Sequence, residues 1–361
     1  METAENRSTT LAMLLPENAD AALIISETNR RYFTGFVSSL GYLFVTRSGS
    51  FLLVDSRYEE AARKQARNCE VILFKKLSDT MKELIVQKKL RSIMLESSAF
   101  TLTEADRIEA IFSQAGAVSI RSGALDELIG RQRIIKTSEE IAKMRRAQRI
   151  TEDSFRETIK LIREGVTEKE LALDLEFRMR RSGAEAVSFD LIVLTGSKTS
   201  MPHGVPDYTK IRYGDFILFD IGATSEGYHS DMTRTVAFGR ADNSQKRIYD
   251  TVLQAQLHAL DTVREGATCG EVDRAARSYI DNAGYQGLFG HSTGHGVGLD
   301  IHEAPSVSPE SSLELKSGMV ITVEPGIYVQ GKGGVRIEDM VVVTSEGYIN
   351  LALLPKELIV L

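Results

Sequence analysis

The chain has very few cysteines and no long apolar run, and these absences exclude two classes of protein. Only Cys69 and Cys269 occur among 361 residues, and they lie 200 positions apart, which indicates free thiols in a reducing compartment rather than a disulfide-stabilised fold. No run of about 18 apolar residues is present, which excludes a membrane-spanning helix. The first twenty residues lack the basic start and apolar core of a secretory signal. We therefore expect a cytoplasmic protein without a membrane partner.

Charge of one sign and histidine are also scarce. The 44 Lys and Arg residues nearly balance 50 Asp and Glu residues, and a formal net charge of −6 argues against a sequence-independent grip on phosphate backbones, so we expect no nucleic-acid partner. All six His lie between positions 203 and 302. A hydrophobic content of 42% is typical of a globular protein, and the length predicts two domains of about 150 residues each.

The first part of the chain predicts a mixed α/β domain over residues 1–130. Short apolar runs bounded by Gly, Asn, Asp or Ser indicate strands, and helical spacing of apolar residues lies between them. The expected strands are Ala22–Ser26, Tyr42–Thr46, Ser50–Val54, Val71–Phe74 and Ser92–Leu95, and the expected helices are Arg57–Asn68, Ser78–Lys89 and Thr103–Ala115. A basic stretch then leads to Thr137-Ser-Glu-Glu140, a capping box that opens a helix of the second domain, residues 131–361.

The second part contains two similar sequence segments at an offset of 101 residues. Arg163-Glu-Gly-Val-Thr167 is matched by Arg264-Glu-Gly-Ala-Thr268, each between two helical patterns, and the following helices end at Gly183 and Gly284. Capping boxes after helix-ending glycines resemble each other by chance, but a duplication would place two similar halves around a shared site. Gly-containing turns favour antiparallel pairing of the strands expected at Phe189–Leu194, Asp215–Ile221, Tyr228–Phe238, Met319–Val323 and Val335–Thr344.

Two aspartates flank the first of these turns. The midpoint of Asp220 and Asp231 lies between Ser225 and Glu226, so a symmetric hairpin places the two carboxylates directly opposite each other. Like charges in that position destabilise a strand pair, and a buried unpaired carboxylate is costly. A bound cation removes both problems. The alternatives are a register slip of one residue or an ion pair with Arg234.

Two glutamates form a second candidate pair. Glu324 ends an apolar strand, where Pro325 holds it extended, and Glu338 lies in another apolar strand. The glycine-rich stretch 326–334 can turn the chain back so that both carboxylates approach. The alternative is a core salt bridge between Glu338 and Arg336, although neighbouring residues point to opposite faces of a strand.

Histidines complete the candidate site. The stretch 290–298 places four glycines around His291 and His295 and continues to His302, and neutral imidazole is a common metal ligand. Two Asp and two Glu supply about −4, which two divalent ions would balance. With one His among the ligands, this set suits Mn²⁺, with Co²⁺, Fe²⁺ or Zn²⁺ as alternatives. Two metals about 3.5–4 Å apart can activate a shared water and polarise a carbonyl, which indicates hydrolysis.

These motifs resemble the pita-bread metallopeptidases, and the whole chain resembles their Xaa-Pro branch, the aminopeptidase P and prolidase proteins. The resemblance is carried by Asp220 and Asp231 with the following Thr-Arg-Thr, and by His295-Gly-Val-Gly-Leu-Asp-Ile-His302, Thr322-Val-Glu-Pro-Gly326 and Arg336-Ile-Glu-Asp339. Asn29–Phe36 and Leu53–Tyr58 are similar to the creatinase-type N-terminal domain. The implied fold class is α+β: a C-terminal pita-bread fold, with duplicated helix pairs around a curved antiparallel sheet, and a smaller α/β creatinase-type N-terminal domain.

The resemblance also implies roles for site residues. It implies that two divalent metals, usually manganese in this branch, are bound by Asp220, Asp231, His295, Glu324 and Glu338. Glu324 would also act as the general base for the bridging water. His203 and His302 match positions that contact the substrate and stabilise the tetrahedral intermediate, and His291 matches a position that lines the pocket. Arg336 is expected to orient a metal-binding carboxylate.

The implied function is a cytoplasmic, homodimeric aminopeptidase that hydrolyses the bond between an N-terminal residue and a following proline. The alternative in the same branch is prolidase, which takes only dipeptides and needs a cation for the substrate's C-terminal carboxylate. The sequence does not identify an Arg for that purpose. A metal-free creatinase-like hydrolase and a non-enzymatic binding module are more distant alternatives, because both lack the metal ligands that are all present here.

Overall fold

The computed structural model describes residues 7–361, and the chain divides into two compact units. These are an N-terminal unit, Met1–Arg133, and a C-terminal unit, Ile134–Leu361. The first six of the twenty residues considered for a secretory signal lie outside the described residues. Within the described chain, no helix combines the length and apolar character needed to cross a membrane.

The N-terminal unit contains a six-stranded sheet in the order β4-β3-β2-β1-β5-β6. Strand β2 is antiparallel to both of its neighbours, whereas the other pairs are parallel. The apolar sides of β1 to β3 and β5 pack against α4 and α5 around residues such as Phe44 and Phe112. The elements are α1 Arg7–Leu14, β1 Ala21–Ile24, α2 Glu27–Thr34, β2 Tyr42–Thr46, β3 Gly49–Val54, α3 Glu59–Gln65, β4 Glu70–Leu73, α4 Leu77–Lys88, β5 Ser92–Leu95, α5 Leu102–Gln114, β6 Val118–Ile120 and α6 Ala124–Arg133.

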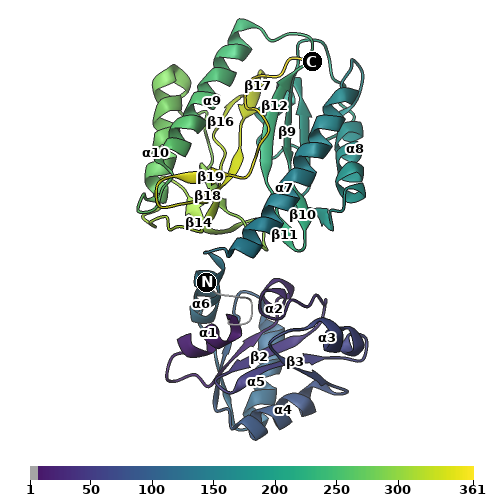
Figure 1. The fold of residues 1–361 in the computed structure, drawn as a ribbon, viewed down its shortest axis with the longest axis vertical. Coiled ribbons are helices and arrows are strands. Elements are labelled where there is room, and N and C mark those ends of the chain that lie inside the picture. Colours follow the sequence, from purple (N-terminus) through teal and green to yellow (C-terminus); the bar gives the residue numbers. More distant parts are fainter. Residues whose placement is uncertain (1–6) are drawn as a thin grey trace. The chain divides into compact units, whose positions relative to one another are not determined.

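The C-terminal unit is built from two helix pairs and antiparallel strands that lie between them (Figure 1). Its first half contains α7 Ser138–Thr158, η2 Ile159–Leu161, α8 Glu168–Arg181, β7 Ala186–Val187, β8 Ile192–Thr195, η3 Gly196–Ser200, β9 Phe216–Ile221, β10 Ala223–Ser225, β11 Tyr228–His229 and β12 Met232–Ala237. Its second half contains α9 Asn243–Thr262, α10 Cys269–Ile280, η4 Asp281–Tyr285, β13 Gly294–Gly296, β14 Glu303–Val307, β15 Val320–Val323, β16 Gly326–Val329, β17 Gly333–Arg336, β18 Asp339–Val343 and β19 Tyr348–Asn350. The strand orders are β12-β9-β8, β11-β10-β7, β14-β13-β15-β18-β19 and β16-β17.

The two similar sequence segments correspond to a structural repeat. Thr167 and Thr268 are the N-caps of α8 and α10, and each forms a capping box with the Glu three residues later. Each helix start also pairs with a later segment of its own half, through bridges from Thr167 to Lys210 and from Thr268 to Glu314. Each half therefore begins its second helix with the same cap and the same backbone pairing, which supports the duplication.

Two expected strands are interrupted, which corrects the prediction. The stretch 228–238 divides into β11 and β12 at Ser230 and Asp231, and the stretch 335–344 divides into β17 and β18 at Ile337 and Glu338. The cause is a change of sheet, since β11 and β17 pair in different sheets from β12 and β18. At the second break, the amide of Glu338 donates to the carbonyl of Thr233 in the first half.

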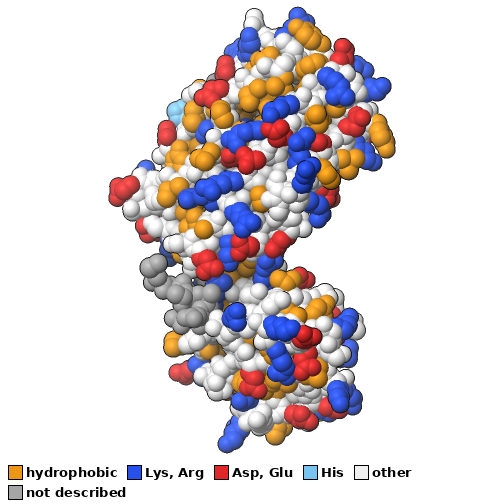
Figure 2. Space-filling model, turned by 45° about the vertical axis from the view of Figure 1, so that its right-hand side comes forward, with side chains coloured by type: hydrophobic (Ala, Val, Ile, Leu, Met, Phe, Trp, Pro, Cys, Tyr) orange, Lys and Arg blue, Asp and Glu red, His pale blue; other side chains and the backbone are white. Residues whose placement is uncertain are grey.

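The surface carries both signs of charge. On the face drawn in Figure 2, Lys and Arg side chains are interspersed with Asp and Glu side chains on each unit. This distribution agrees with the mild net charge. It gives that face no extended region of one sign.

Candidate metal centre

The register of the hairpin that carries Asp220 differs from the expected one by two residues. Asp220 of β9 pairs with Thr233 of β12, and not with Asp231. The turn is centred on Glu226 and Gly227, whose φ angles of 51° and 82° are those of a type I′ turn, so the centre lies one residue later than expected. Because side chains alternate with a period of two, this shift leaves both aspartates on the same face, and both line one cavity.

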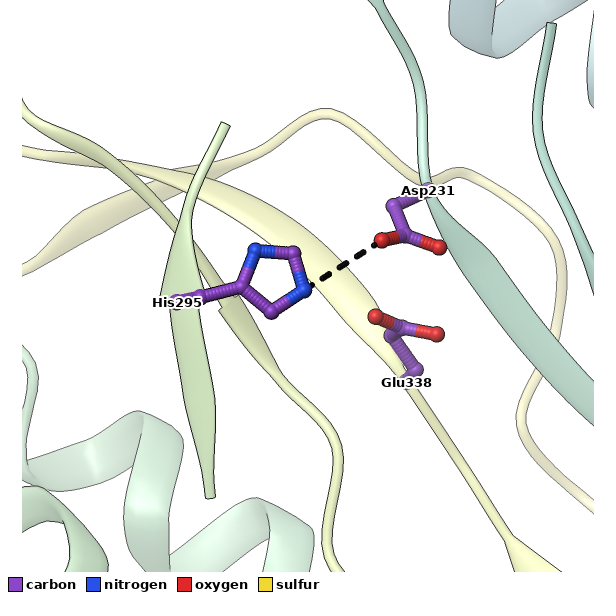
Figure 3. A group of neighbouring side chains, drawn as sticks. All are labelled: Asp231, His295 and Glu338. Carbon is purple, nitrogen blue, oxygen red and sulfur yellow. Dashed lines mark ion pairs between the residues drawn. The ribbon is translucent and has the colours of Figure 1, made fainter. Parts of the chain in front are cut away.

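Asp231, His295 and Glu338 form the most compact part of the site. Each offers one ligand atom, and these atoms lie within 4.8 Å of one another. Figure 3 shows the three side chains pointing toward one another from separate segments, with His295 on β13, Asp231 just before β12 and Glu338 just before β18. The Nε2 atom of His295 lies 3.5 Å from Oδ2 of Asp231. One imidazole and two carboxylates at this spacing fit a divalent cation.

Glu324 and Glu338 occupy facing positions of an interrupted ladder. Val323 pairs with Asp339 on one side of the break, and Gly326 pairs with Arg336 on the other. The glycine-rich stretch therefore turns the chain back so that the two Glu face each other. Glu324 Oε1 lies 3.5 Å from His295 Nε2 and accepts a hydrogen bond of 3.2 Å from the Thr322 hydroxyl.

Arg336 holds one oxygen of Asp220. Its guanidinium donates to Asp220 Oδ2, to the Tyr328 hydroxyl at 2.7 Å and to the Thr233 hydroxyl at 3.2 Å. Asp220 Oδ1 is buried and has no hydrogen-bond partner among the described residues. A buried orphan carboxylate oxygen is costly, so Asp220 fits the role of a ligand with one oxygen oriented by Arg336 and the other free to bind a cation.

The electrostatics of the site favour cation binding. Burial, together with neighbouring carboxylates, raises the pKa of Asp231 and of Glu338 well above their usual range. Burial also raises the pKa of Glu324 to about 8 and lowers the pKa of His295 to about 4. A divalent cation would favour the charged carboxylates, and a neutral imidazole is the form that ligates metals.

The neighbouring carboxylate of Asp339 shows the contrast. It accepts hydrogen bonds of 2.8 Å from both Arg234 and Lys356, and one of 3.1 Å from Gln256. Burial alone would raise the pKa of Asp339, but Arg234 and Lys356 hold it below the usual value. The expected alternative partner of the hairpin aspartates, Arg234, is therefore engaged elsewhere. Asp339, which pairs with Arg234 and Lys356, therefore lies beside the four carboxylates of the cavity. Arg336 is the Arg or Lys that lines that cavity, and it pairs with Asp220.

His291 is held as a neutral side chain in the wall of the cavity. The cavity has a volume of about 680 Å³ and is lined by all eight expected site residues, which are His203, Asp220, Asp231, His291, His295, His302, Glu324 and Glu338. The Nδ1 atom of His291 lies 2.8 Å from the carbonyl of Ser292, and its Nε2 lies 2.8 Å from the Tyr328 hydroxyl. Since the carbonyl requires Nδ1–H, Nε2 accepts from Tyr328, and burial lowers the His291 pKa to about 4. Both nitrogens are occupied, so His291 shapes the cavity.

His203 and His302 are the histidines that can meet a bound molecule. His203 is exposed on the loop after η3, and the His302 ring lies 4.4 Å from the His295 ring. Both line the cavity. An imidazolium beside a carbonyl can stabilise the negative charge that develops during attack.

Several supporting residues were missed by the sequence analysis. Asp273 and Arg277 of α10 form a two-point ion pair, and Arg277 also donates to the carbonyls of Phe289 and His291. Asp273 in turn accepts from the amide and hydroxyl of Thr293. A signal was present, because an acid and an arginine four residues apart on a helix face each other.

Two threonines also support the ligands. The Thr233 hydroxyl donates to Glu338 at 2.7 Å, and the Thr322 hydroxyl accepts from the His295 amide at 3.0 Å. Thr233 lies two positions after Asp231, and Thr322 lies two positions before Glu324. The period of a strand therefore places each Thr on the face of its neighbouring acid, a signal that could have identified both.

Comparisons with known proteins point to one family. Residues 142–345 match metallopeptidase family M24, and residues 11–135 match the creatinase/prolidase N-terminal domain. A protein of Pyrococcus horikoshii named Xaa-Pro dipeptidase is 38% identical over 342 residues, which covers 94% of each chain. A solved structure of an Xaa-Pro dipeptidase from Bacillus anthracis has a TM-score of 0.94 and 38% identity, and the match covers 99% of this chain and 100% of that chain. An X-Pro aminopeptidase from Thermotoga maritima has a TM-score of 0.91 and 36% identity, with coverage of 98% and 100%.

Proposed function

The chain belongs to metallopeptidase family M24, and on that premise we propose that it hydrolyses the peptide bond between an N-terminal residue and a following proline. The observation that carries the proposal is the convergence of four buried or half-buried carboxylates and His295 on one cavity. An orphaned oxygen of Asp220 and the raised pKa values of three of the acids indicate that the set is built for cations.

Asp220, Asp231, His295, Glu324 and Glu338 would hold two divalent metals. When bound, such ions lower the pKa of a water and polarise the carbonyl under attack. The carboxylate-rich donor set favours Mn²⁺, with Co²⁺, Fe²⁺ or Zn²⁺ as alternatives. Glu324 is the general base in this proposal, since Thr322 orients its Oε1 and its raised pKa suits a proton acceptor near neutral pH.

The histidines complete the mechanism. His203 and His302 donate to the carbonyl oxygen as it gains negative charge. His291 keeps its place through Tyr328 and Arg336, and so closes the wall of the cavity. The proton that Glu324 takes from the water is then available for the leaving imino nitrogen of proline.

Substrate length separates two assignments within this class. The dipeptidase alternative is favoured by similarity, because the dipeptidase structure matches with a higher TM-score and identity than the aminopeptidase structure. The aminopeptidase assignment is favoured by the cavity lining, in which Arg336 is the only Lys or Arg and is engaged by Asp220 and Tyr328. We propose dipeptides with a C-terminal proline as the first substrates to examine and longer Xaa-Pro peptides as the second.

The experiment compares Leu-Pro, Leu-Pro-Ala and Leu-Ala as substrates, with Mn²⁺, Co²⁺, Fe²⁺ or Zn²⁺ added in separate assays. Release of leucine from Leu-Pro alone assigns a dipeptidase, and efficient release from Leu-Pro-Ala assigns an aminopeptidase. Leu-Ala is the matched control for the requirement for proline. Failure to cleave either proline peptide with any of the four metals would contradict the proposal.

We also propose a cytoplasmic homodimer, in which the creatinase-type N-terminal unit restricts the length of the peptide that reaches the cavity. This part follows from the family resemblance. Light scattering of the purified protein measures its mass in solution, and a monomeric mass of about 40 kDa would contradict the dimer.

A further inference from the structure

An ion pair between half-buried Lys198 and buried Glu168 lies where the two ends of the loop that carries His203 come together. Lys198, in η3, donates to Glu168 Oε2 and to the carbonyl of Val205 at 3.3 Å, and its Nζ lies 2.8 Å from Asp207 Oδ2. Lys198 therefore joins the two ends of the segment 199–204, which contains His203.

Glu168 anchors this arrangement from the start of α8. Its side chain is fully buried, and it also accepts from the amides of Thr195 at 2.8 Å and Asp207 at 3.1 Å. Every oxygen of the carboxylate is thus bound to the segment that enters or leaves the loop. A buried carboxylate of this kind depends on its partner, because removing the cation leaves an uncompensated charge.

The structural repeat shows that the fold does not need a carboxylate at this position. Offset by 101 residues, Cys269 takes the place of Glu168 at the start of α10. Its amide donates to the carbonyl of Leu313, as the amide of Glu168 donates to that of Thr209. The same helix start and backbone pairing therefore form with a small apolar side chain. What Glu168 adds in the first half is its connection to the loop.

The loop offers little else to hold His203. Its side chain is exposed and makes no hydrogen bond to another described residue. The adjacent Gly204 packs on β8, since an added Cβ would lie 2.6 Å from Cδ1 of Leu194. The location of the ring in the cavity therefore depends on the path of the loop backbone. That path is held by Lys198 and by Thr199, whose hydroxyl donates to the carbonyl of Gly196 and accepts from the amide of Gly334 at 2.8 Å.

We propose that Lys198, held by Glu168 and Asp207, is a positioning residue that presents His203 to the substrate. The inference rests on the proposed function, since His203 must contact the peptide for its position to matter. It assigns a purpose to an ion pair that lies outside the metal centre and takes no direct part in hydrolysis.

A double-mutant cycle tests this proposal. In the metal-loaded protein, Lys198→Met is expected to lower kcat/KM for the cleaved Xaa-Pro substrate about tenfold, whereas in the His203→Ala background the same change is expected to have less than a twofold effect. The difference corresponds to about 1 kcal/mol of coupling. Equal factors in the two backgrounds would show that Lys198 acts independently of His203 and would overturn the proposal.

Two controls separate positioning from folding. Lys198→Arg, which can still reach the two carboxylates, is expected to keep at least half of the wild-type kcat/KM. Lys160→Met removes an exposed lysine that pairs with Glu157 and is expected to leave kcat/KM unchanged. If Lys198→Met does not fold, Asp207→Asn replaces it in the cycle, with an expected threefold effect that disappears in the His203→Ala background.

A measurement without catalysis completes the test. In the metal-free protein labelled with ¹³C-histidine, the ring resonance of His203, identified by its loss in His203→Ala, is expected to shift or broaden in Lys198→Met. The resonance of His258, on α9, is expected to stay in place. An unchanged His203 resonance would overturn the inference. A wild-type protein inactive on all Xaa-Pro peptides would instead contradict the proposed function, so the two failures are distinguishable.

Discussion

The two halves of the C-terminal unit start their second helices alike and hold their histidine loops differently. In the second half, Asp273 and Arg277 both lie on α10, and Arg277 reaches out to the carbonyls of Phe289 and His291. In the first half, the acid Glu168 lies on α8, but its cation, Lys198, lies in η3, beside the loop that carries His203. His291 of the second half is half-buried and hydrogen-bonded at both nitrogens, whereas His203 of the first half is exposed.

The carboxylates of the two halves also face different partners across their strand pairs. Glu324 and Glu338 of the second half face each other across an interrupted ladder, whereas Asp220 of the first half faces Thr233. The difference shows how a duplicated scaffold acquires separate tasks. The second half supplies three of the five proposed ligands and the hydrogen-bonded His291, and the first half supplies two ligands and the exposed His203.

The largest expected effect comes from the second half. Glu324→Gln preserves the volume of the side chain but cannot take a proton from water, so kcat is expected to fall by about a thousandfold. The melting temperature should not fall. Glu310→Gln, an exposed acid of the same half, is the matched control and should retain full activity. Substantial turnover by Glu324→Gln would exclude it as the base.

The second prediction concerns the ion pair between Asp273 and Arg277, which supports the loop that carries His291. Arg277→Met leaves the fully buried Asp273 without its cation, so the free energy of unfolding is expected to fall by about 3 kcal/mol, or about 6–12 °C in melting temperature. Thermal denaturation measures this loss, with the exposed Arg274→Met on the same helix as control. If Arg277→Met lowers the melting temperature no more than Arg274→Met does, the assignment of Arg277 as a structural support is wrong.

The smallest effect concerns the facing glutamates in the metal-free protein. Burial raises the pKa of Glu324 to about 8, and burial with neighbouring carboxylates raises that of Glu338. A carboxyl with a raised folded-state pKa contributes stability that is complete below the unfolded pKa and is lost as pH rises through the folded pKa. After chelation, the melting temperature is therefore expected to fall by about 5 °C between pH 5.5 and pH 8.

Metal should remove this slope, and mutation of one glutamate should reduce it. Saturating Mn²⁺ is expected to abolish the fall, because bound cations favour the charged carboxylates at both pH values. Glu338→Gln should flatten it in the metal-free protein, since one of the two facing acids no longer titrates. A melting temperature that does not depend on pH after chelation would contradict the assigned directions.

Much of the fold could be predicted because its signals are local. In the N-terminal unit, the strands β2 and β5 have the predicted bounds, and the capping box at Thr137 opens α7 as expected. The family resemblance and the α+β fold class are confirmed by the matches to family M24 and to the dipeptidase structure.

The failures arise where the deciding interaction is not local. The hairpin register was missed because a non-glycine residue, Glu226, adopts a positive φ in the turn. The breaks beside Asp231 and Glu338 result from changes of sheet, which a run of apolar residues does not reveal. The connection between Glu168 and Lys198 spans thirty positions and follows no period, so it required the three-dimensional structure.

The junction of the two halves has a consequence for how the protein resists unfolding. Asp231 belongs to the first half, and His295 and Glu338 belong to the second, so a cation held by all three would cross-link segments 107 positions apart. Such a cation binds the folded chain and not the unfolded one, so it stabilises the fold by mass action, in a protein whose two cysteines are both free thiols. The ions proposed for hydrolysis would thus also stabilise the association of the two halves, and their removal would allow the halves to unfold separately.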